Sequence, residues 1–372
     1  MDFKENNEAI RNYLAECTHV VIKLGTNILT PHIESSDMSY FKGLALQIKK
    51  LVENGKKVLV VSSGAVGFGK KIKDIKTGEL KKKETIAEKQ AFASMGQGLL
   101  IDTYRENFQT ANLETGQILV SLSDFLSRNH YKNLKRTLDQ LMEWGAIPVI
   151  NENDAITVEG LKFGDNDTLS AFIAGMYPQS LLIILTTVDG FYLDDKKVDL
   201  VTRLDETHFA AAGGATAGGI GGMKTKLHAA KKILLSGQAM NIASGEHPAV
   251  IEEIIQAQNV GTWFYPLISS SLSFRKRWLV HHRHVMGKIT IDSGAREALK
   301  DGSASLLLVG VLSVEGNFSA GSVIEIVEAN KNELARGIAA YSSDEIHEML
   351  EVNEKRRGVY VVHRDNMIMT NE

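Results

Sequence analysis

Four short apolar runs dominate the chain as far as residue 190. They are HVVIKLG (19–25), KVLVVSSG (57–64), AIPVINEN (146–153) and LLIILTTVDG (181–190). Each run is rich in valine, isoleucine and leucine and lacks polar alternation, which is typical of strands buried on both faces of a parallel sheet. We therefore predict that the four runs form strands of one parallel sheet.

Helical patterns separate the predicted strands. Residues 39–55 and 133–145 place apolar side chains at helical spacing, and both segments end in glycine, a common residue just beyond a helix. A further helix is predicted over 226–237 and a short strand over 239–245. This alternation predicts an α/β fold, with a doubly wound and mostly parallel sheet, over residues 15–266.

The pattern changes after residue 266. Residues 269–277 are predicted to form a linker. Beyond it, short apolar segments at 287–292, 304–316 and 321–329 alternate with glycine turns, which predicts antiparallel strands. We expect a small β-rich domain over residues 274–360.

Polar or small residues follow the four predicted strands of the first domain. These segments are 23–27, 62–65, 151–154 and 186–190. Because ligands of doubly wound sheets bind at the carboxyl ends of the strands, this convergence predicts a binding site at that edge.

A glycine-rich run, GGATAGGIGGMKTK, covers residues 213–226 and leads into a helical pattern. Glycines let backbone N–H groups close around an anion, and the N-terminus of the next helix favours negative charge. Lys226 adds a positive charge in the first turn. The run is not a P-loop, because Met223 rather than glycine precedes Lys224. A phosphate-binding loop and a flexible surface loop both remain open from this run alone.

Two further segments carry candidate chemistry. Lys23 ends the first predicted strand, where an ammonium group suits a phosphate, although such a lysine often faces solvent. Ser63 and the N–H groups of Gly64 and Ala65 suit a substrate carboxylate, and the alternative is an ordinary helix N-cap.

Acidic and amide side chains gather at two other segments. Asp154 follows a predicted strand, and Asp165, Asn166 and Asp167 precede a helical run. The ordinary interpretation is that Asp167 or Asn166 caps that helix. However, these segments hold more Asp and Asn residues than capping one helix requires. They suit holding an ammonium group, orienting lysines, or supporting Mg²⁺ through water.

Composition narrows the possible classes of protein. The chain has 372 residues, 44% of them hydrophobic and 23% charged, and a formal net charge of −3. This charge gives no long-range attraction to nucleic acid or anionic membranes. A single cysteine, Cys17, cannot form an internal disulfide and fits a reducing compartment. With no signal-peptide pattern and no apolar stretch near roughly 20 residues, we predict a cytoplasmic protein.

The remaining polar segments receive structural interpretations. His130, His208 and His228 stand alone, and no Ser-His-Asp or Cys-His arrangement is indicated. The sequence HHRH (281–284) lacks metal-ligand spacing and is interpreted as an exposed basic turn. The lysine-rich stretch 70–83 is interpreted as a solvated helix or loop rather than an anion-binding patch.

Taken together, these segments resemble the amino-acid kinase superfamily, and within it the branch that carries a C-terminal PUA domain. The matching segments are VVIKLGTNILT, VVSSGAVGFG, ASMGQG, GAIPVINENDAI, FGDNDTLSA, GGMKTKLHAAK and GTWFYP, followed by RKRW, DSGAREAL, SLLLVGV and GVYVVHRDN. The resemblance covers nearly the whole chain. It implies ATP-dependent phosphorylation of the γ-carboxylate of L-glutamate, the first step of proline biosynthesis.

The resemblance also implies roles for individual residues. Lys23 and Lys226 would act on the transferring phosphoryl group, with Asp165 and Asp167 organising the site. Glutamate would be bound by Ser63, Gly64, Ala65, Asp154 and Asn166. ATP would be contacted by Lys23, Gly25, Thr186, Thr187, Ile220, Gly221, Gly222, Met223, Lys224, Thr225 and Lys226. The chain departs from the family pattern at Thr187, where an Asp is frequent, and at Ile220, where a Thr is frequent.

The implied mechanism needs no general base, because the γ-carboxylate is already an anion near neutral pH. Lysines, Mg²⁺ and helix N-termini would stabilise the charge, with Mg²⁺ held mainly by ATP phosphates and water rather than by direct protein ligands.

The resemblance further implies a homo-oligomer, proline as a feedback inhibitor and a functional link to glutamyl-phosphate reductase. The residues themselves leave the oligomeric state, proline sensitivity and the role of the second domain open. We expect no membrane or nucleic-acid partner. Two alternatives remain: another superfamily member acting on a different carboxylate, carbamate or nucleotide, and an RNA-binding regulatory protein that uses the second domain.

Overall fold

The chain forms two compact units, residues 1–269 and residues 270–372. The computed structural model describes residues 3–73, 84–157, 165–213, 222–266, 274–281, 285–300, 303–330, 332–351 and 358–370. No helix within these ranges is long and apolar enough to cross a membrane. The domain bounds 15–266 and 274–360 stay predictions.

The first unit is built on an eight-stranded sheet among the described residues. Its strands, in spatial order, are β3 (Glu114–Val120), β4 (Ala146–Glu152), β2 (Lys57–Ser62), β1 (His19–Leu24), β5 (Ser180–Thr186), β9 (Ala239–Ser244), β10 (Thr262–Phe264) and β8 (Leu200–Val201). The strands from β3 to β9 run parallel, and β10 and β8 run in the opposite direction. The predicted α/β fold with a mostly parallel sheet is confirmed.

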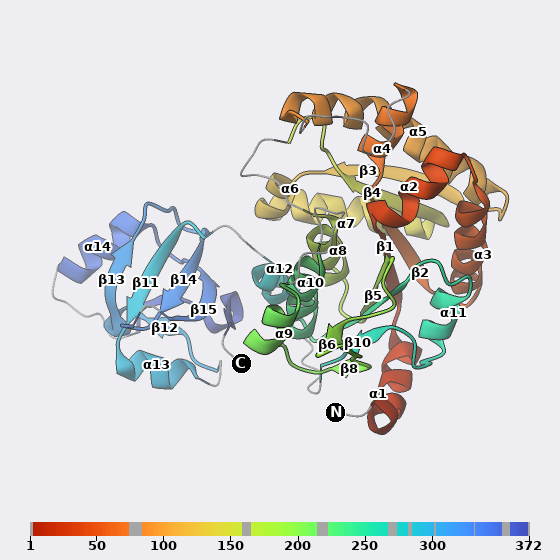
Figure 1. Cartoon of the computed structure of the whole chain (residues 1–372). Coiled ribbons are helices and arrows are strands. Elements are labelled where there is room, and N and C mark those ends of the chain that lie inside the picture. The colour runs from red at the N-terminus through yellow and green to blue at the C-terminus, as the bar shows by residue number, and fades with distance from the viewer. Residues whose placement is uncertain are drawn as a thin grey trace. The chain divides into compact units, whose positions relative to one another are not determined.

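Helices lie on both faces of this sheet, as expected where strands are apolar throughout (Figure 1). The helices of the unit are α1 (Phe3–Glu16), α2 (Thr26–Ser35), α3 (Ser39–Glu53), α4 (Ala65–Ile72), α5 (Ile86–Gln109), α6 (Leu122–Leu126), α7 (Arg128–Glu143), α8 (Asn166–Gly175), α9 (Glu206–Ala211), α10 (Met223–Leu235) and α11 (Val250–Ile255). A short hairpin, β6 (Tyr192–Leu193) with β7 (Lys196–Lys197), follows β5.

The alternation of side chains along β1 sets the position of the first candidate residue. Val20, Ile22 and Leu24 belong to the hydrophobic core shared with α1, α2, α3 and α5. Successive strand residues point to opposite faces, so Val21 and Lys23 point to the other face, where α8 packs on β1 and β5. Lys23 is therefore directed at α8.

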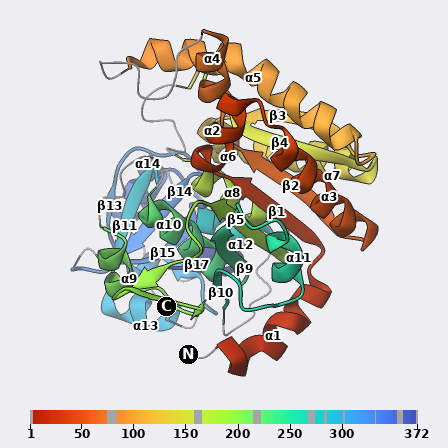
Figure 2. The ribbon, with the colours of Figure 1, turned by 45° about the vertical axis from the view of Figure 1, so that its right-hand side comes forward.

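Helices α4 and α5 cross in very close contact, and Figure 2 shows them side by side. A Cβ atom added at Gly96 of α5 would lie 2.0 Å from the carbonyl oxygen of Ala65 and 2.3 Å from the backbone nitrogen of Gly69. A Cβ at Gly69 would lie 2.0 Å from the carbonyl oxygen of Phe92. Only glycine at both positions allows this approach.

The second unit is β-rich, as predicted. Its five-stranded sheet has the order β13 (Val311–Glu315), β11 (Gly287–Ile291), β14 (Val323–Val327), β15 (Glu333–Ile338) and β17 (Met367–Met369), and β12 (Leu306–Leu307) pairs with β16 (Tyr360–Val362). Helical segments are α12 (Phe274–His281), η1 (Leu308–Gly310), α13 (Ser293–Leu299), α14 (Ser343–Glu351) and η2 (Arg364–Asn366).

Two details of this unit differ from the sequence prediction. β11 and β14 pair in parallel rather than antiparallel, because a long connection through α13 and β13 separates them. The end of the predicted linker, residues 274–277, belongs to α12, which packs on β15 and β17. Of the predicted basic turn at 281–284, only residue 281 is described, and residues 74–83 of the lysine-rich stretch also lie outside the described ranges.

Candidate active site

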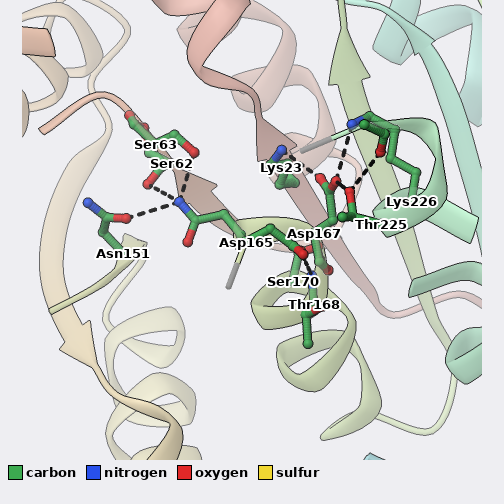
Figure 3. A network of polar contacts seen from close by, with 12 residues as sticks. Lys23, Ser62, Ser63, Asn151, Asp165, Asp167, Thr168, Ser170, Thr225 and Lys226 are labelled. Atoms are coloured by element: carbon green, nitrogen blue, oxygen red, sulfur yellow. Dashed lines mark hydrogen bonds and ion pairs between the residues drawn. The ribbon is translucent and has the colours of Figure 1, made fainter. Parts of the chain in front are cut away.

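Two lysines from distant parts of the chain meet at one buried carboxylate. Nζ of Lys23, at the end of β1, lies 2.6 Å from Oδ1 of Asp167, and Nζ of Lys226, in the first turn of α10, lies 3.1 Å from Oδ2. The Thr225 hydroxyl donates to the same Oδ2 at 2.7 Å. Asp167 has no exposed surface, and the lysines are 6% and 5% exposed. Figure 3 shows the three side chains turned toward Asp167.

The neighbouring charges of this cluster change the pKa values of Asp167 and Lys226. Burial by itself raises the pKa of Asp167, but the ammonium groups of Lys23 and Lys226 outweigh it and hold that pKa below its ordinary value. Burial lowers the pKa of Lys226, and the Asp167 carboxylate opposes this effect. Two ammonium groups on one carboxylate leave positive charge for an incoming anion.

The start of α8 places Asp167 in this cluster. Asp165 is the N-cap, and its carboxylate accepts a hydrogen bond from the backbone N–H of Thr168 at 2.6 Å. The capping alternative therefore applies to Asp165 and not to Asn166 or Asp167, which leaves both of these side chains available to the site. Burial raises the pKa of Asp165.

Asn166 organises a neighbouring group of amides and hydroxyls. Its Nδ2 donates to Ser63 Oγ at 2.8 Å, to Asn151 Oδ1 at 3.1 Å and to the Ser62 carbonyl at 3.2 Å. Asn151 in turn donates through Nδ2 to Oε1 of Gln97 at 2.9 Å. In Figure 3, Ser62, Ser63 and Asn151 form a group beside the lysine cluster. Consecutive residues, Asn166 and Asp167, thus join the two halves of the site.

The turn from β2 into α4 has a glycine at the N-cap position, so the N-cap residue has no side chain to cap the helix. Gly64 is the N-cap of α4, with φ 114°, a conformation that favours glycine, and no side chain caps the helix. The Ser63 hydroxyl accepts from Asn166 instead of capping α4. The first N–H groups of α4, from Ala65 onward, are therefore not capped by the N-cap residue, and N–H groups of this kind suit an anion.

The structure leaves several predicted residues at the margin of these contacts. Thr187 and Lys224 are exposed, and Thr186 is half-buried at the end of β5. The backbone N–H of Asp154 donates to the Glu152 carbonyl at 2.9 Å. At Gly25 an added Cβ would make only ordinary contacts, 3.7 Å from Lys23 Nζ, so the fold itself does not demand glycine there.

Part of the predicted nucleotide loop is not described. Ile220 and Gly221 lie outside the described residues, as does most of the glycine-rich run. The structure does describe Gly222, which is the N-cap of α10, and Met223, which is half-buried. The helix begins at Met223, three residues earlier than predicted, so Thr225 and Lys226 both lie in its first turn.

Sequence reasoning missed Gln97 as a contributor to the site, and it gave no individual role to Ser62 or Asn151, although both lie in the polar strand-end segments 62–65 and 151–154. Asn151 was visible as a strand-end residue, and Gln97 lies in the ASMGQG segment of the family resemblance. Neither carries a charge or a spacing that indicates function, because their role depends on contacts between distant segments.

The chain matches the amino acid kinase family over residues 18–244 and the PUA domain over residues 287–357. It therefore belongs to the amino acid kinase family, with a C-terminal PUA domain.

Its similarity to curated proteins is more specific. It is 37% identical to the glutamate 5-kinase of Thermoanaerobacter pseudethanolicus over 366 residues, 94% of this chain and 97% of that protein. The glutamate 5-kinase of Geobacter sp. strain M21 is 37% identical over 96% of this chain and 99% of its own length. That of Geobacter sulfurreducens is 36% identical over 96% and 98%. These relatives place the chain among the glutamate 5-kinases.

Among solved structures, a PUA domain from Aeropyrum pernix K1 is 30% identical over 21% of this chain and 41% of that chain. Its TM-score of 0.19 is too low to support a structural argument.

Proposed function

We propose that this protein transfers the γ-phosphoryl group of ATP to the side-chain carboxylate of L-glutamate, with the Lys23–Asp167–Lys226 cluster as the transfer centre. The observation that carries this proposal is the pair of buried lysines on one carboxylate, where the end of β1 meets the starts of α8 and α10. Membership of the amino acid kinase family supports ATP as the donor, and the glutamate 5-kinase relatives support glutamate as the acceptor.

The main difficulty of the reaction is the repulsion between two anionic reactants, and the two lysines reduce it. Both reactants are anions, and the transferring phosphoryl group spreads negative charge over its oxygens. Lys23 and Lys226 offer fixed positive charge in a buried site, where electrostatic stabilisation is stronger than in water. Asp167 holds both ammonium groups in place, so they need no reorganisation during transfer.

The group around Asn166 suits the amino-acid end of the acceptor. Nδ2 of Asn166 is occupied by Ser63, Asn151 and the Ser62 carbonyl, so the orientation of the amide is fixed. This leaves Oδ1 of Asn166 as the acceptor for an ammonium group. The N–H groups at the start of α4, from Ala65, suit a carboxylate. Asp154 adds negative charge for the ammonium group.

The nucleotide would lie on the other side of the lysine cluster. Gly25 presents bare backbone beside Lys23, and the N-terminus of α10 at Gly222–Lys226 faces the same cluster. Thr186, Thr187, Met223 and Lys224 are proposed to line the path of ATP.

Magnesium is proposed as the companion of ATP. In the described residues, no group of three or more His, Cys, Asp or Glu could hold a metal ion. Both oxygens of Asp167 are engaged by Lys23, Lys226 and Thr225, so this carboxylate is poorly suited to ligate a metal directly. The donor set fits an ion held by phosphates and water, with Asp165 as the adjacent carboxylate. Such an ion neutralises phosphate charge.

The cellular part of the proposal rests on the relationship to the glutamate 5-kinases. We propose a cytoplasmic homo-oligomer that proline inhibits and whose product passes to glutamyl-phosphate reductase in proline biosynthesis.

Product trapping tests the proposed reaction. The protein is incubated with ATP, Mg²⁺ and hydroxylamine, with L-glutamate, D-glutamate, L-aspartate or carbamate as acceptor. An acyl phosphate reacts with hydroxylamine to give a hydroxamate, so hydroxamate with L-glutamate and little with the other acceptors supports the proposal. Hydroxamate only with another acceptor, or ADP release independent of any acceptor, contradicts it.

A further inference from the structure

Helix α5 contacts the end of β4 and the residues that follow it. Gln97 Oε1 accepts from Nδ2 of Asn151 at 2.9 Å, and Gln90 Nε2 donates to the carbonyl of Thr157 at 3.3 Å. Gln90 and Gln97 are seven residues apart, which places them on the same face of a helix. Asp154, a predicted glutamate ligand, lies between the two anchored residues.

The contact at Gln97 also determines how Asn151 faces the site. With Nδ2 of Asn151 donating to Gln97, its Oδ1 accepts from Nδ2 of Asn166 at 3.1 Å and from the backbone N–H of Glu152 at 2.9 Å. If the Asn151 amide turned over, its Nδ2 would meet two donors. Gln97 therefore stabilises the one orientation of Asn151 that fits Asn166.

The residue beside Gln97 fixes the other wall of the same half-site. Gly96 packs against the backbone of Ala65 and Gly69, so closely that no side chain fits between α5 and α4. Ala65 belongs to the turn that presents N–H groups for a carboxylate. One turn of α5, Gly96–Gln97, thus contacts both the Ser63–Ala65 turn and the Asn151–Asn166 pair.

We propose that α5 is a positioning helix for the amino-acid half of the site, and that Gln97 is a positioning residue that acts through Asn151 and Asn166. The lysine cluster lies outside these contacts, so Gln97 governs the binding of glutamate and leaves phosphoryl transfer itself largely untouched. This inference rests on the proposed function, because it assigns a role to a residue that supports the glutamate side.

The test compares Gln97→Met, which keeps the length of the side chain but removes the acceptor, with Gln97→Glu, which keeps an oxygen acceptor for Asn151. We expect Gln97→Met to raise the KM for glutamate about tenfold, the effect of losing one hydrogen bond in a partly buried network. The KM for ATP and kcat at saturating glutamate should change by less than about threefold. Gln97→Glu should restore most of the affinity for glutamate.

The matched control is Gln109→Met, the same change at an exposed position in the last turn of α5. Its kinetic constants should equal those of the unaltered protein. Gln90→Met should raise the KM for glutamate less than Gln97→Met does, and it carries the test if Gln97→Met does not fold. Thermal shift with glutamate alone gives a readout of binding without turnover, and the shift should shrink in Gln97→Met.

The outcomes separate this inference from the proposed function. If the unaltered protein and Gln109→Met phosphorylate glutamate while Gln97→Met keeps the same KM for glutamate, the positioning role is wrong and the proposed function stands. An equal rise in both KM values, or a loss confined to kcat, also overturns the positioning role. Absence of glutamate-dependent turnover in the unaltered protein refutes the proposed function instead.

Discussion

Nζ of Lys23 lies 2.6 Å from Oδ1 of Asp167, inside the first unit and almost out of contact with solvent. The register of β1 directs Lys23 at α8, and the N-cap at Asp165 starts α8 so that Asp167 meets it. A buried ion pair costs desolvation on both sides and is a weak source of stability by itself. Its position at the end of β1, with Lys226 on the same carboxylate, is what the proposed role in phosphoryl transfer requires.

Replacing Lys23 tests whether the cluster acts on the reacting group. Lys23→Ala removes one fixed positive charge from the transfer centre, and removal of such a group typically costs about 10²–10³ in kcat. We expect a loss of that order in glutamate-dependent ADP release, with a smaller change in the KM for glutamate. Lys231→Ala, at an exposed position of α10, is the control. Turnover in Lys23→Ala close to that of the control would show that Lys23 is not catalytic.

Removing the amide or hydroxyl side of the site should affect binding more than turnover. Ser63→Ala removes the acceptor at 2.8 Å from Asn166, and Asn166→Ala removes the whole hydrogen-bonding centre. We expect the KM for glutamate to rise about tenfold in Ser63→Ala and more in Asn166→Ala, because each lost hydrogen bond is worth about 1 kcal/mol. Steady-state kinetics with Asn129→Ala, at an exposed position of α7, gives the comparison. A fall in kcat without a change in KM would contradict this role.

Replacing two glycines of α5 with alanine should have opposite effects on stability. Gly96→Ala places Cβ 2.0 Å from a backbone oxygen, so α4 and α5 must move apart, and we expect a loss of about 3 kcal/mol in unfolding free energy. Gly98→Ala places Cβ in open space, and alanine is the better helix former by about 1 kcal/mol. Denaturant unfolding measures both. Equal stability of the two variants would argue against the close crossing.

The pH dependence of stability should report on His19. Burial above all, together with the nearby Lys57 and Lys135, lowers its pKa from 6.5 to about 4. The ring stacks on Tyr177 at 3.9 Å. Since the unfolded chain takes up a proton between pH 6.5 and about pH 4 and the folded chain does not, stability falls as pH decreases through this range.

The size of this effect follows from the shift, at roughly 3 kcal/mol as an upper limit. Denaturant unfolding of the unaltered protein and of His19→Gln gives the comparison. As pH falls from 6.5 to about 4, the unaltered protein should lose up to roughly 3 kcal/mol of unfolding free energy relative to His19→Gln. A difference that is constant with pH would show that His19 titrates normally.

Much of the fold followed from the sequence, because the buried strands are continuous apolar runs with few alternatives. β1, β2, β4 and β5 end within a few residues of their predicted ends. β3 was not predicted: it is an edge strand with half-exposed polar residues at its start, and edge strands lack the continuous apolar run of central ones.

The charged part of the candidate site was also visible, because Lys23 ends a predicted strand and Asp167 and Lys226 stand at the starts of predicted helices, where ligands of such a sheet gather. The contacts made by the supporting amides were not. Asn151 and Gln97 meet only through the tertiary contact between α5 and the end of β4, and the Gly96 contact with α4 depends on helix geometry that a single sequence does not specify. The parallel pairing of β11 with β14 was missed for the same reason, since pairing between distant strands leaves little trace in local alternation.

The most direct test of the central claim is glutamate-dependent ADP release by the unaltered protein and by Lys226→Ala, measured side by side at saturating ATP and Mg²⁺. We predict ADP release that requires L-glutamate in the unaltered protein. Its rate should fall about 10²–10³-fold in Lys226→Ala, because the second ammonium group at Asp167 is lost. Equal rates in the two proteins, or ADP release that does not depend on glutamate, would contradict the assignment of the Lys23–Asp167–Lys226 cluster as the phosphoryl-transfer centre.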